Sequence, residues 1–465
     1  MTMLDVDRRT TDQSKAAAPP VPRAGRMAQL DASIWLRRDQ IGFLRHALGR
    51  YGDIFSLRVL GMPLIMVNHP DYVQRVLVDN HANYDKDSLL YRVVRPVLRD
   101  GLIGAVGGDA WHRQRRLMQP SFHRPNVAVF ASNMTDETGT MLDRWDRDVT
   151  DGEVVDFTAE LGHLALRIVT RTLFGADVGD STEEIEADFT VANRIMGAFF
   201  RFPFPPLSWP TPSHRRLRAL IGNLDAFIDE LVRQRADRTE ERHDLLSVLA
   251  AAVDQDTGYR MTAEQLHHEV LNIMVGGYET TTHTLGWMFY QVARNPEVLQ
   301  RIQHEADAVL GGRPPTFDDL FALPYSRRVV DETLRMNSAA WQTMRHAIDE
   351  DVIGGHRIPA GSGIYINILT LHRHPDYWPD PDRFDPDRFL PEAIASRPRN
   401  SYLPFGLGPR NCIGKHFALT ELHLVLVMIL QRYDLKLPDS VTTIPMQPMV
   451  TLRPKGGVHM HVRRR

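Results

Sequence analysis

The sequence predicts a mainly helical fold with small β-sheets (α+β), and two kinds of pattern indicate it. Apolar residues recur at helical spacing over most of the 465 residues, and one such run extends from Thr262 to about Arg294. Three short regions instead have the composition and spacing of strands, at residues 54–67, 352–367 and 450–462. Long helices interrupted by a few short strands are typical of a helical domain with its sheets set at one side.

The first part of the chain should contain a small sheet. A helix is expected at residues 40–51, followed by strands at 54–59 and 64–67 that are joined through Gly61-Met62-Pro63. The preceding residues include the extended run Pro19-Pro20-Val21-Pro22 and lack the apolar centre of a signal peptide. We therefore expect a flexible leader over residues 1–25 and a single domain over residues 26–465.

The clearest helix begins at Thr262, where Thr-Ala-Glu-Gln forms a capping box, and ends before Asn295-Pro296. At about 1.5 Å per residue this helix would span roughly 50 Å. Its middle is apolar at 271–275 and again at 285–290, which is too apolar for a surface helix. We expect it to be central and buried.

Charge and cysteine content narrow the classes of function. The chain has 55 Lys+Arg against 58 Asp+Glu, so no overall field favours nucleic acid or anionic lipid, and no nucleic-acid partner is expected. No apolar run reaches ~18 residues, so no membrane span is expected either. A single cysteine excludes an internal disulfide and suits a reducing compartment. These features predict a cytoplasmic protein, which we expect to be a monomer.

The single cysteine lies in the run Phe405-Gly406-Leu407-Gly408-Pro409-Arg410-Asn411-Cys412-Ile413-Gly414, ahead of an apolar helical stretch at 417–430. Three glycines and a proline predict a tight loop. Such a loop can direct backbone N–H groups at the sulfur, and the following helix presents its positive end, so both favour a thiolate that can bind a metal. The alternative is a buried structural cysteine, which needs no glycine-rich loop.

A second constellation, Gly276-Gly277-Tyr278-Glu279-Thr280-Thr281, lies mid-way along the long helix. Both glycines share a helix face with Thr280, so the missing side chains leave room for a small ligand. The alternative is close helix packing at the glycines, with threonine hydroxyls bonded back to the preceding turn. Glu279 favours a functional interpretation because a buried carboxylate needs a partner or a role.

The loop around Cys412 resembles the signature F-x-x-G-x-R-x-C-x-G of the cytochrome P-450 family at every fixed position. The resemblance implies that Cys412 is the proximal iron ligand of a haem b that lies between the long helix and the cysteine loop. It also implies that Arg410 neutralises a haem propionate. Glu279 and Thr280 match the family's acid–alcohol pair, which passes protons through ordered water to dioxygen during turnover.

Other matches follow in the family's order. Trp111 and Arg115 match W-x-x-x-R on a helix, although alone this spacing more often marks a surface cation–π contact. Arg345 matches an arginine in a strand. The resemblance implies that these three residues and Arg410 hold the haem propionates.

A charged triad is implied as well. Glu332 and Arg335 match an E-x-x-R helix, which in the family combines with a loop arginine, here Arg388, in a structural role. Alone, such an i,i+3 pair is usually an exposed salt bridge. The histidines lack the company of a zinc site and are expected to be packing or surface residues: His267, His268, His346, His372 and His374.

The resemblance implies a haem-thiolate monooxygenase that inserts one oxygen atom from dioxygen into an apolar small molecule, or couples it oxidatively, in secondary metabolism. The chain has no room for a fused reductase. We therefore expect electrons from NAD(P)H through a separate ferredoxin or flavodoxin, docked at a cationic patch near Arg113, Arg116, Lys415 and His416. The aromatic and proline-rich segment 199–206 would lie near the substrate entrance, as a lid or as a packed loop.

Two alternative functions are a haem-thiolate peroxygenase or isomerase, which needs no proton relay, and a non-catalytic haem sensor. An intact Glu279-Thr280 pair argues against the first, and the lack of a visible output domain argues against the second. The sequence does not name the substrate or the site of its oxidation.

Overall fold

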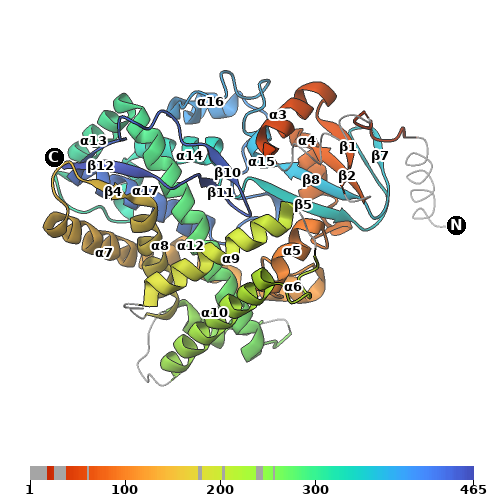
Figure 1. Ribbon diagram of the computed structural model, residues 1–465, viewed down its shortest axis with the longest axis horizontal. Helices are drawn as coiled ribbons and strands as arrows, with labels where there is room; N and C mark the ends of the chain where they lie inside the picture. The colour runs from red at the N-terminus through yellow and green to blue at the C-terminus, as the bar shows by residue number, and fades with distance from the viewer. Residues whose placement is uncertain are drawn as a thin grey trace. The chain divides into compact units, whose positions relative to one another are not determined.

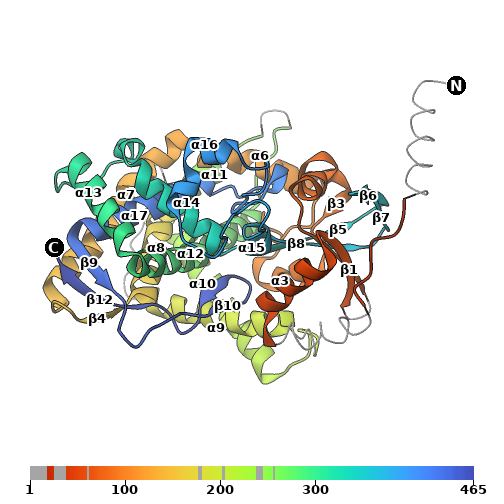
Figure 2. The same ribbon diagram turned by 90° about the horizontal axis from the view of Figure 1, so that it is seen from above.

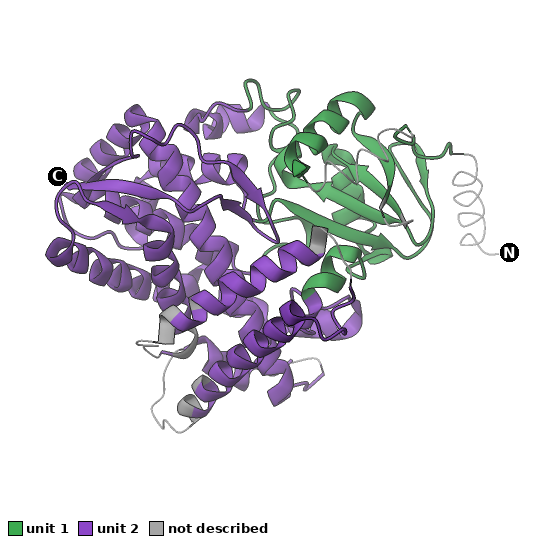
Figure 3. Ribbon diagram, in the orientation of Figure 1, with its two compact units in different colours: residues 1–94, 340–381, 397–412 green, residues 95–339, 382–396, 413–465 purple. Residues whose placement is uncertain are grey.

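The computed structural model describes residues 18–25, 38–59, 62–175, 181–201, 205–236, 244–254 and 257–465. The chain divides into two compact units, coloured green and purple in Figure 3. Unit 1 comprises residues 1–94, 340–381 and 397–412, and unit 2 comprises residues 95–339, 382–396 and 413–465. The single domain expected from the sequence stays a prediction.

Unit 1 is built around a five-stranded sheet, which follows α3 (Gln40–Tyr51) at the residues expected for that helix. In spatial order its strands are β1 (Ile54–Val59), β2 (Met62–Val67), β8 (Gly363–Asn367), β5 (Gln342–Ala347) and β3 (Tyr84–Asp85). Only β2 and β8 are parallel, while the other neighbours are antiparallel. Ile65, Val67, Ile364 and Ile366 alternate along this central pair and are buried in the core of the unit.

Part of the expected leader is attached to this unit. The backbone of residues 19–24 runs beside the sheet, where the Ala24 N–H donates to the Ser56 carbonyl at 3.0 Å and the Arg357 N–H donates to Pro19 at 2.9 Å. Arg357 belongs to the hairpin of β6 (Asp351–Ile353) and β7 (His356–Ile358). Residues 1–17 lie outside the described part of the chain, so their flexibility stays a prediction.

Unit 2 contains most of the helices (Figure 1). They are α6 (Gly108–Met118), α7 (Arg124–Asp148), α8 (Phe157–Phe174), α9 (Ser181–Arg201), α10 (Pro212–Ala236), α11 (Leu245–Ala251), α12 (Ala263–Arg294), α13 (Pro296–Leu310), α14 (Pro324–Met336), α16 (Pro391–Ala395) and α17 (Lys415–Arg432). None of the helices in the described ranges is both long and apolar enough to cross a membrane.

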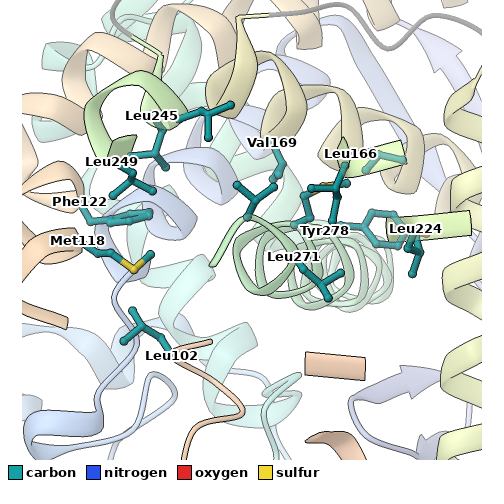
Figure 4. Close-up of a cluster of buried hydrophobic side chains, with 14 of the residues drawn as sticks. Leu102, Met118, Phe122, Leu166, Val169, Leu224, Leu245, Leu249, Leu271 and Tyr278 are labelled. Carbon is teal, nitrogen blue, oxygen red and sulfur yellow. The ribbon is translucent and has the colours of Figure 1, made fainter. Parts of the chain in front are cut away.

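The long helix α12 is confirmed, with the predicted capping box at Thr262 and Gln265. Nearly every residue from Tyr278 to Val292 is buried. Side chains of α8, α10 and α12 form one apolar cluster (Figure 4), which includes Leu166, Leu224 and Tyr278. Each such side chain contributes about 1.5–3 kcal/mol when fully buried, so packing and not helix propensity fixes this helix.

The last strands of the chain also belong to unit 2. β4 (Val154–Asp156), β12 (His459–Arg464) and β9 (Tyr433–Lys436) form a three-stranded sheet near the C-terminus (Figure 2). β10 (Met446–Pro448) and β11 (Leu452–Pro454) form a separate antiparallel pair. The predicted Gly456-Gly457 turn therefore connects strands of two different sheets.

Candidate active site

Cys412 ends a tight loop in unit 1, and its side chain is exposed. Its backbone N–H donates to the Phe405 carbonyl at 2.8 Å, which closes the loop. Gly408 has a φ of +71°, and a Cβ at this position would lie 1.9 Å from the Leu77 carbonyl oxygen, so only glycine fits here. An exposed thiol on a constrained loop argues against the alternative of a buried structural cysteine.

Two of the expected propionate ligands lie in the same unit as Cys412, beside a lysine that the sequence analysis missed. Arg345 on β5 and Lys86 are 5% and 7% exposed, respectively. Burial, Arg345 and Arg410 together lower the pKa of Lys86 to about 8, which indicates that the three cations lie close together. Buried cations are tolerated when anionic groups compensate them, so this cluster has the chemistry of a carboxylate-binding site.

A tyrosine completes the cluster. The ammonium group of Lys86 lies 4.5 Å from the centre of the Tyr91 ring, and the Tyr91 hydroxyl is 3.2 Å from the Thr343 hydroxyl. Burial opposes ionisation of this phenol, but Lys86 and Arg345 lower its pKa to about 7. In the sequence, Lys86 is flanked by Asp85 and Asp87 and looks like an ordinary surface charge. No local motif signals the role of either residue.

The other two expected propionate ligands lie on α6 of unit 2. Trp111 is buried, and its indole N–H donates to the Leu102 carbonyl at 3.2 Å. Because an indole has a single donor, Trp111 can bind a cofactor through this atom only if Leu102 releases it. Arg115 follows one turn later and is half-buried.

The segment that carries Leu102 is attached to α12 by two side chains outside the recognised motifs. The Leu102 N–H donates to the Glu269 carboxylate at 3.0 Å, and the Ile103 N–H donates to the Asn272 side chain at 2.9 Å. Glu269 is fully buried, and burial raises its pKa to about 7. In the sequence Glu269 lies just before the apolar stretch 271–275, and no local motif indicates this contact.

Thr280 lies on α12, where its hydroxyl donates to the Gly276 carbonyl one turn earlier. A Cβ at Gly277 would lie 2.7 Å from the Val169 side chain of α8, so this glycine permits close helix packing. Both contacts are those of the packing alternative that the sequence left open. The Thr280 oxygen keeps its lone pairs, however, and so can still accept a hydrogen bond from water.

Glu279 points into a polar network within unit 2. Its carboxylate accepts hydrogen bonds from Thr451 at 2.7 Å, from Arg453 at 2.6 Å and from the Asn193 side chain, while His283 lies 3.6 Å away. Burial favours the neutral acid, but Arg453 and His283 outweigh it and lower the pKa of Glu279 to about 2. Glu279 is therefore a carboxylate held in an ion pair at neutral pH.

A polar pocket adjoins this carboxylate. It encloses about 610 Å³ of empty space, including its opening to solvent. Its lining comes from α8, α9, α12, β10, β11 and the Gly456-Gly457 turn, and includes Thr158, Thr190, Glu279, His283 and Arg453. The pocket offers ordered water a place beside Glu279.

The charged triad is confirmed in unit 2. Glu332 and Arg335 are both fully buried and form two parallel hydrogen bonds of 2.7 Å, and Arg388 lies 3.5 Å from the same carboxylate. Glu332 also accepts from the Asp385 N–H at 2.9 Å, and Arg335 donates to the Arg383 carbonyl at 3.2 Å. The triad therefore fixes residues 383–388 against α14.

The histidines contribute to packing and ion pairs. His267 lies between Asp225 and Asp229, and His346 lies 3.2 Å from Asp85. Across the described residues, no group of three or more histidine, cysteine and acidic side chains could hold a metal ion. The expected segment 199–206 is only partly visible, because residues 202–204 lie outside the described part of the chain.

A mainly helical fold with an exposed thiol on a glycine-constrained loop, and with the buried cations Arg345 and Lys86 in the same unit, is the arrangement of a haem-thiolate protein. The sequence matches the cytochrome P450 family over residues 17–461. The chain belongs to this family and is a cytochrome P450 monooxygenase.

Individual relatives agree with this assignment. The chain is 34% identical to cyclooctatin synthase of Streptomyces melanosporofaciens over 90% of each chain. It is 32% identical to pentalenene oxygenase of Streptomyces avermitilis, over 88% of this chain and 90% of that protein. The crystal structure of the cytochrome P450DA heme domain superposes with a TM-score of 0.87 at 27% identity, covering 96% of this chain and 98% of that one.

Haem is the cofactor of this family, and the residues present fit it. Cys412 supplies an exposed thiol, and Lys86, Arg345 and Arg410 supply the positive charge that two propionates require.

Proposed function

We propose that this monooxygenase oxidises an apolar small molecule of secondary metabolism, on a haem that is held by Cys412. The observation that carries the proposal is that the Cys412 thiol is exposed on a tight loop, in which position 408 accepts only glycine. The names of the two Streptomyces relatives, a cyclooctatin synthase and a pentalenene oxygenase, support a hydrocarbon-like substrate.

Each residue of the haem site would have its own role. Haem, when bound, supplies the activation of dioxygen. Cys412 would ligate the iron, and Arg345, Arg410, Trp111 and Arg115 would hold the propionates, with Lys86 as a further cation. The buried position of Arg345 and Lys86 orients their charge and excludes water from it.

Cys412→Ser tests the ligation. The reduced, carbon monoxide-treated wild-type protein should show the Soret band of a thiolate-bound haem at about 450 nm. The serine variant, with the same fold, should lack it. A wild-type protein without this band would contradict the proposal.

Thr280 and Glu279 would handle protons. Thr280 would hold a water through its free lone pairs, and Glu279 would orient water from the adjacent pocket as an anion. Since its pKa is about 2, Glu279 would take up a proton only when Arg453 moves away.

Thr280→Ala separates this mechanism from a peroxygenase or isomerase, which needs no proton relay. The variant should consume electrons without forming the corresponding amount of product. Thr284→Ala, which removes a hydroxyl bonded to the Thr280 carbonyl, is the matched control. Unchanged coupling in Thr280→Ala would favour the peroxygenase.

Electrons would come from NAD(P)H through a separate ferredoxin or flavodoxin. The docking surface predicted from the sequence is a cationic patch near Arg113, Arg116, Lys415 and His416, and it stays a proposal. Arg116 is paired with the buried Asp254 at 3.1 Å, and Arg113 lies over the Tyr259 ring. Lys415, Arg124 and Arg327 add positive charge around His416, although Arg327 is paired with Asp331 at 2.9 Å and Arg124 lies over the Phe321 ring. The exposed Lys415 is therefore the strongest candidate within the patch. A monomeric state and a cytoplasmic location stay predictions.

A further inference from the structure

His372 lies in unit 1 at the end of a short helix, and its imidazole contacts the segment that leads to Cys412. The Leu403 N–H donates to His372 Nε2 at 2.9 Å, and the histidine is fully buried. Because Nε2 accepts a hydrogen bond from a backbone amide, the ring is neutral and carries its proton on Nδ1. The geometry therefore fixes both the charge and the tautomer of this side chain.

A chain of backbone hydrogen bonds leads from this contact to the cysteine. The Leu403 carbonyl accepts from the Gly406 N–H at 3.0 Å, which forms the turn that begins the loop. The Phe405 carbonyl, inside that turn, accepts from the Cys412 N–H at 2.8 Å. The imidazole therefore holds Leu403, the first residue of the turn. Phe405, later in the same turn, binds the backbone N–H of Cys412.

The histidine itself rests on a rigid support. It follows α15 (Ile368–Leu371), where the Leu369 N–H donates to the Trp341 carbonyl at 3.2 Å and Thr370 donates to the Asn68 side chain at 2.7 Å. Tyr402 lies 5.2 Å from the His372 ring, between centroids, and the buried Trp378 lies at 6.5 Å. These two neighbouring aromatic rings pack against the imidazole and limit its rotation away from Leu403.

We propose that His372 is a positioning residue for Cys412, which sets the direction of the thiol by holding the Leu403 amide. This inference rests on the proposed ligation of haem by Cys412. His374, two residues later, is buried too, but its Nε2 faces the Asp53 carboxylate at 3.1 Å and its Nδ1 accepts from the Asp376 backbone N–H at 3.3 Å. It therefore serves as a matched control with a similar environment and a different contact.

The test compares His372→Phe, His372→Gln and His374→Gln in the full-length, haem-loaded protein. Phenylalanine fills the space without an acceptor, so the Leu403 N–H is left unsatisfied. We expect His372→Phe to keep its haem content and helical circular dichroism. Its thiolate band at about 450 nm after reduction with carbon monoxide should decay at least fivefold faster than that of the wild type, with replacement by a band at shorter wavelength.

His372→Gln should restore most of the lifetime because its side-chain oxygen can accept the same hydrogen bond, and His374→Gln should match the wild type. Equal band lifetimes in His372→Phe and the wild type would overturn the inference. A wild type without the band would instead contradict the ligation by Cys412, so the two failures are distinguishable.

A second measurement covers the case in which His372→Phe does not fold. Amide hydrogen exchange of the segment 401–412, followed by mass spectrometry, should be at least several times faster in His372→Asn than in His372→Gln, because the shorter amide does not reach Leu403. Equal exchange in these two variants would overturn the inference as well.

Discussion

At the scale of single residues, the side chain that departs most from expectation is Glu279. A residue that passes protons works best when its pKa lies near the operating pH. Glu279 is instead held as an anion by Arg453, with its pKa lowered to about 2. The carboxylate thus also has a structural role, because it joins α12 to α9 through Asn193 and to β11 through Arg453.

Arg453→Met should show how much this ion pair contributes. The variant leaves Glu279 buried without its cation, so we expect a loss of about 3–5 kcal/mol in the free energy of unfolding at pH 7. The depressed pKa gives wild-type Glu279 a stabilising contribution above pH 4.5, which is lost as the pH falls toward 2. The variant should lack this pH dependence, and urea denaturation at several pH values measures both effects.

Arg463→Met is the control, because Arg463 is 68% exposed and pairs with Asp434 at the surface. It should change stability by no more than about 0.5 kcal/mol. An Arg453→Met variant as stable as this control would show that Glu279 does not depend on Arg453.

At the scale of elements, local signals predicted the bounds of the two helices α3 and α12. The bounds of α12 follow from a capping box and a stop at Asn295-Pro296, both of which lie next to the helix ends in the sequence. The triad of Glu332, Arg335 and Arg388 was likewise recognisable, because its helix motif is local and Arg388 lies in a second recognisable run.

The contacts that the sequence did not reveal join distant parts of the chain. The cluster of Lys86 and Arg345 depends on the pairing of β3 with β5, where Tyr84 lies opposite Ala347. Arg453 is 174 residues from Glu279. Hydrophobic periodicity and capping describe neighbours along the chain, so they do not indicate which strand pairs with which, or which cation reaches a buried acid.

Glu269, which attaches the segment around Leu102 to α12, gives a prediction at this scale. Burial raises its pKa from 4.5 to about 7, so the folded state keeps a proton that the unfolded chain releases above pH 4.5. Wild-type stability should therefore decrease as the pH rises from 4.5 to 7. Glu269→Gln keeps an acceptor for the Leu102 N–H but cannot ionise, so it should be more stable than the wild type by about 2–3 kcal/mol at pH 8.

The two proteins should have nearly equal stability at pH 4, where both side chains are neutral. Thermal unfolding at pH 4, 6 and 8 measures the difference. Glu264→Gln, on the exposed first turn of the same helix, should instead lose up to about 1 kcal/mol at pH 8 through the helix dipole. A pH-independent difference between Glu269→Gln and the wild type would contradict the raised pKa.

At the scale of the whole molecule, the positive and negative charges nearly balance, but local regions still have an electrostatic field of their own. The formal net charge is −3, yet burial and the neighbouring cations Lys415, Arg124 and Arg327 lower the pKa of His416. Such a local field can steer an acidic redox protein, although the chain as a whole is slightly acidic. The relevant quantity for docking is therefore the distribution of charge within unit 2.

Lys415→Glu tests this steering with an acidic ferredoxin as the electron donor. Lys415 is exposed, and reversing its charge should slow reduction severalfold at low ionic strength, where the Debye length is about 30 Å at 0.01 M salt. At about 0.5 M salt the variant and the wild type should converge, because screening removes the long-range attraction. Lys436 lies at the end of β9, is 71% exposed and pairs with Asp439, so Lys436→Glu should follow the wild-type salt dependence. Stopped-flow reduction across this range gives the dependence of the reduction rate on ionic strength. An equal dependence in Lys415→Glu and the wild type would place the docking surface elsewhere.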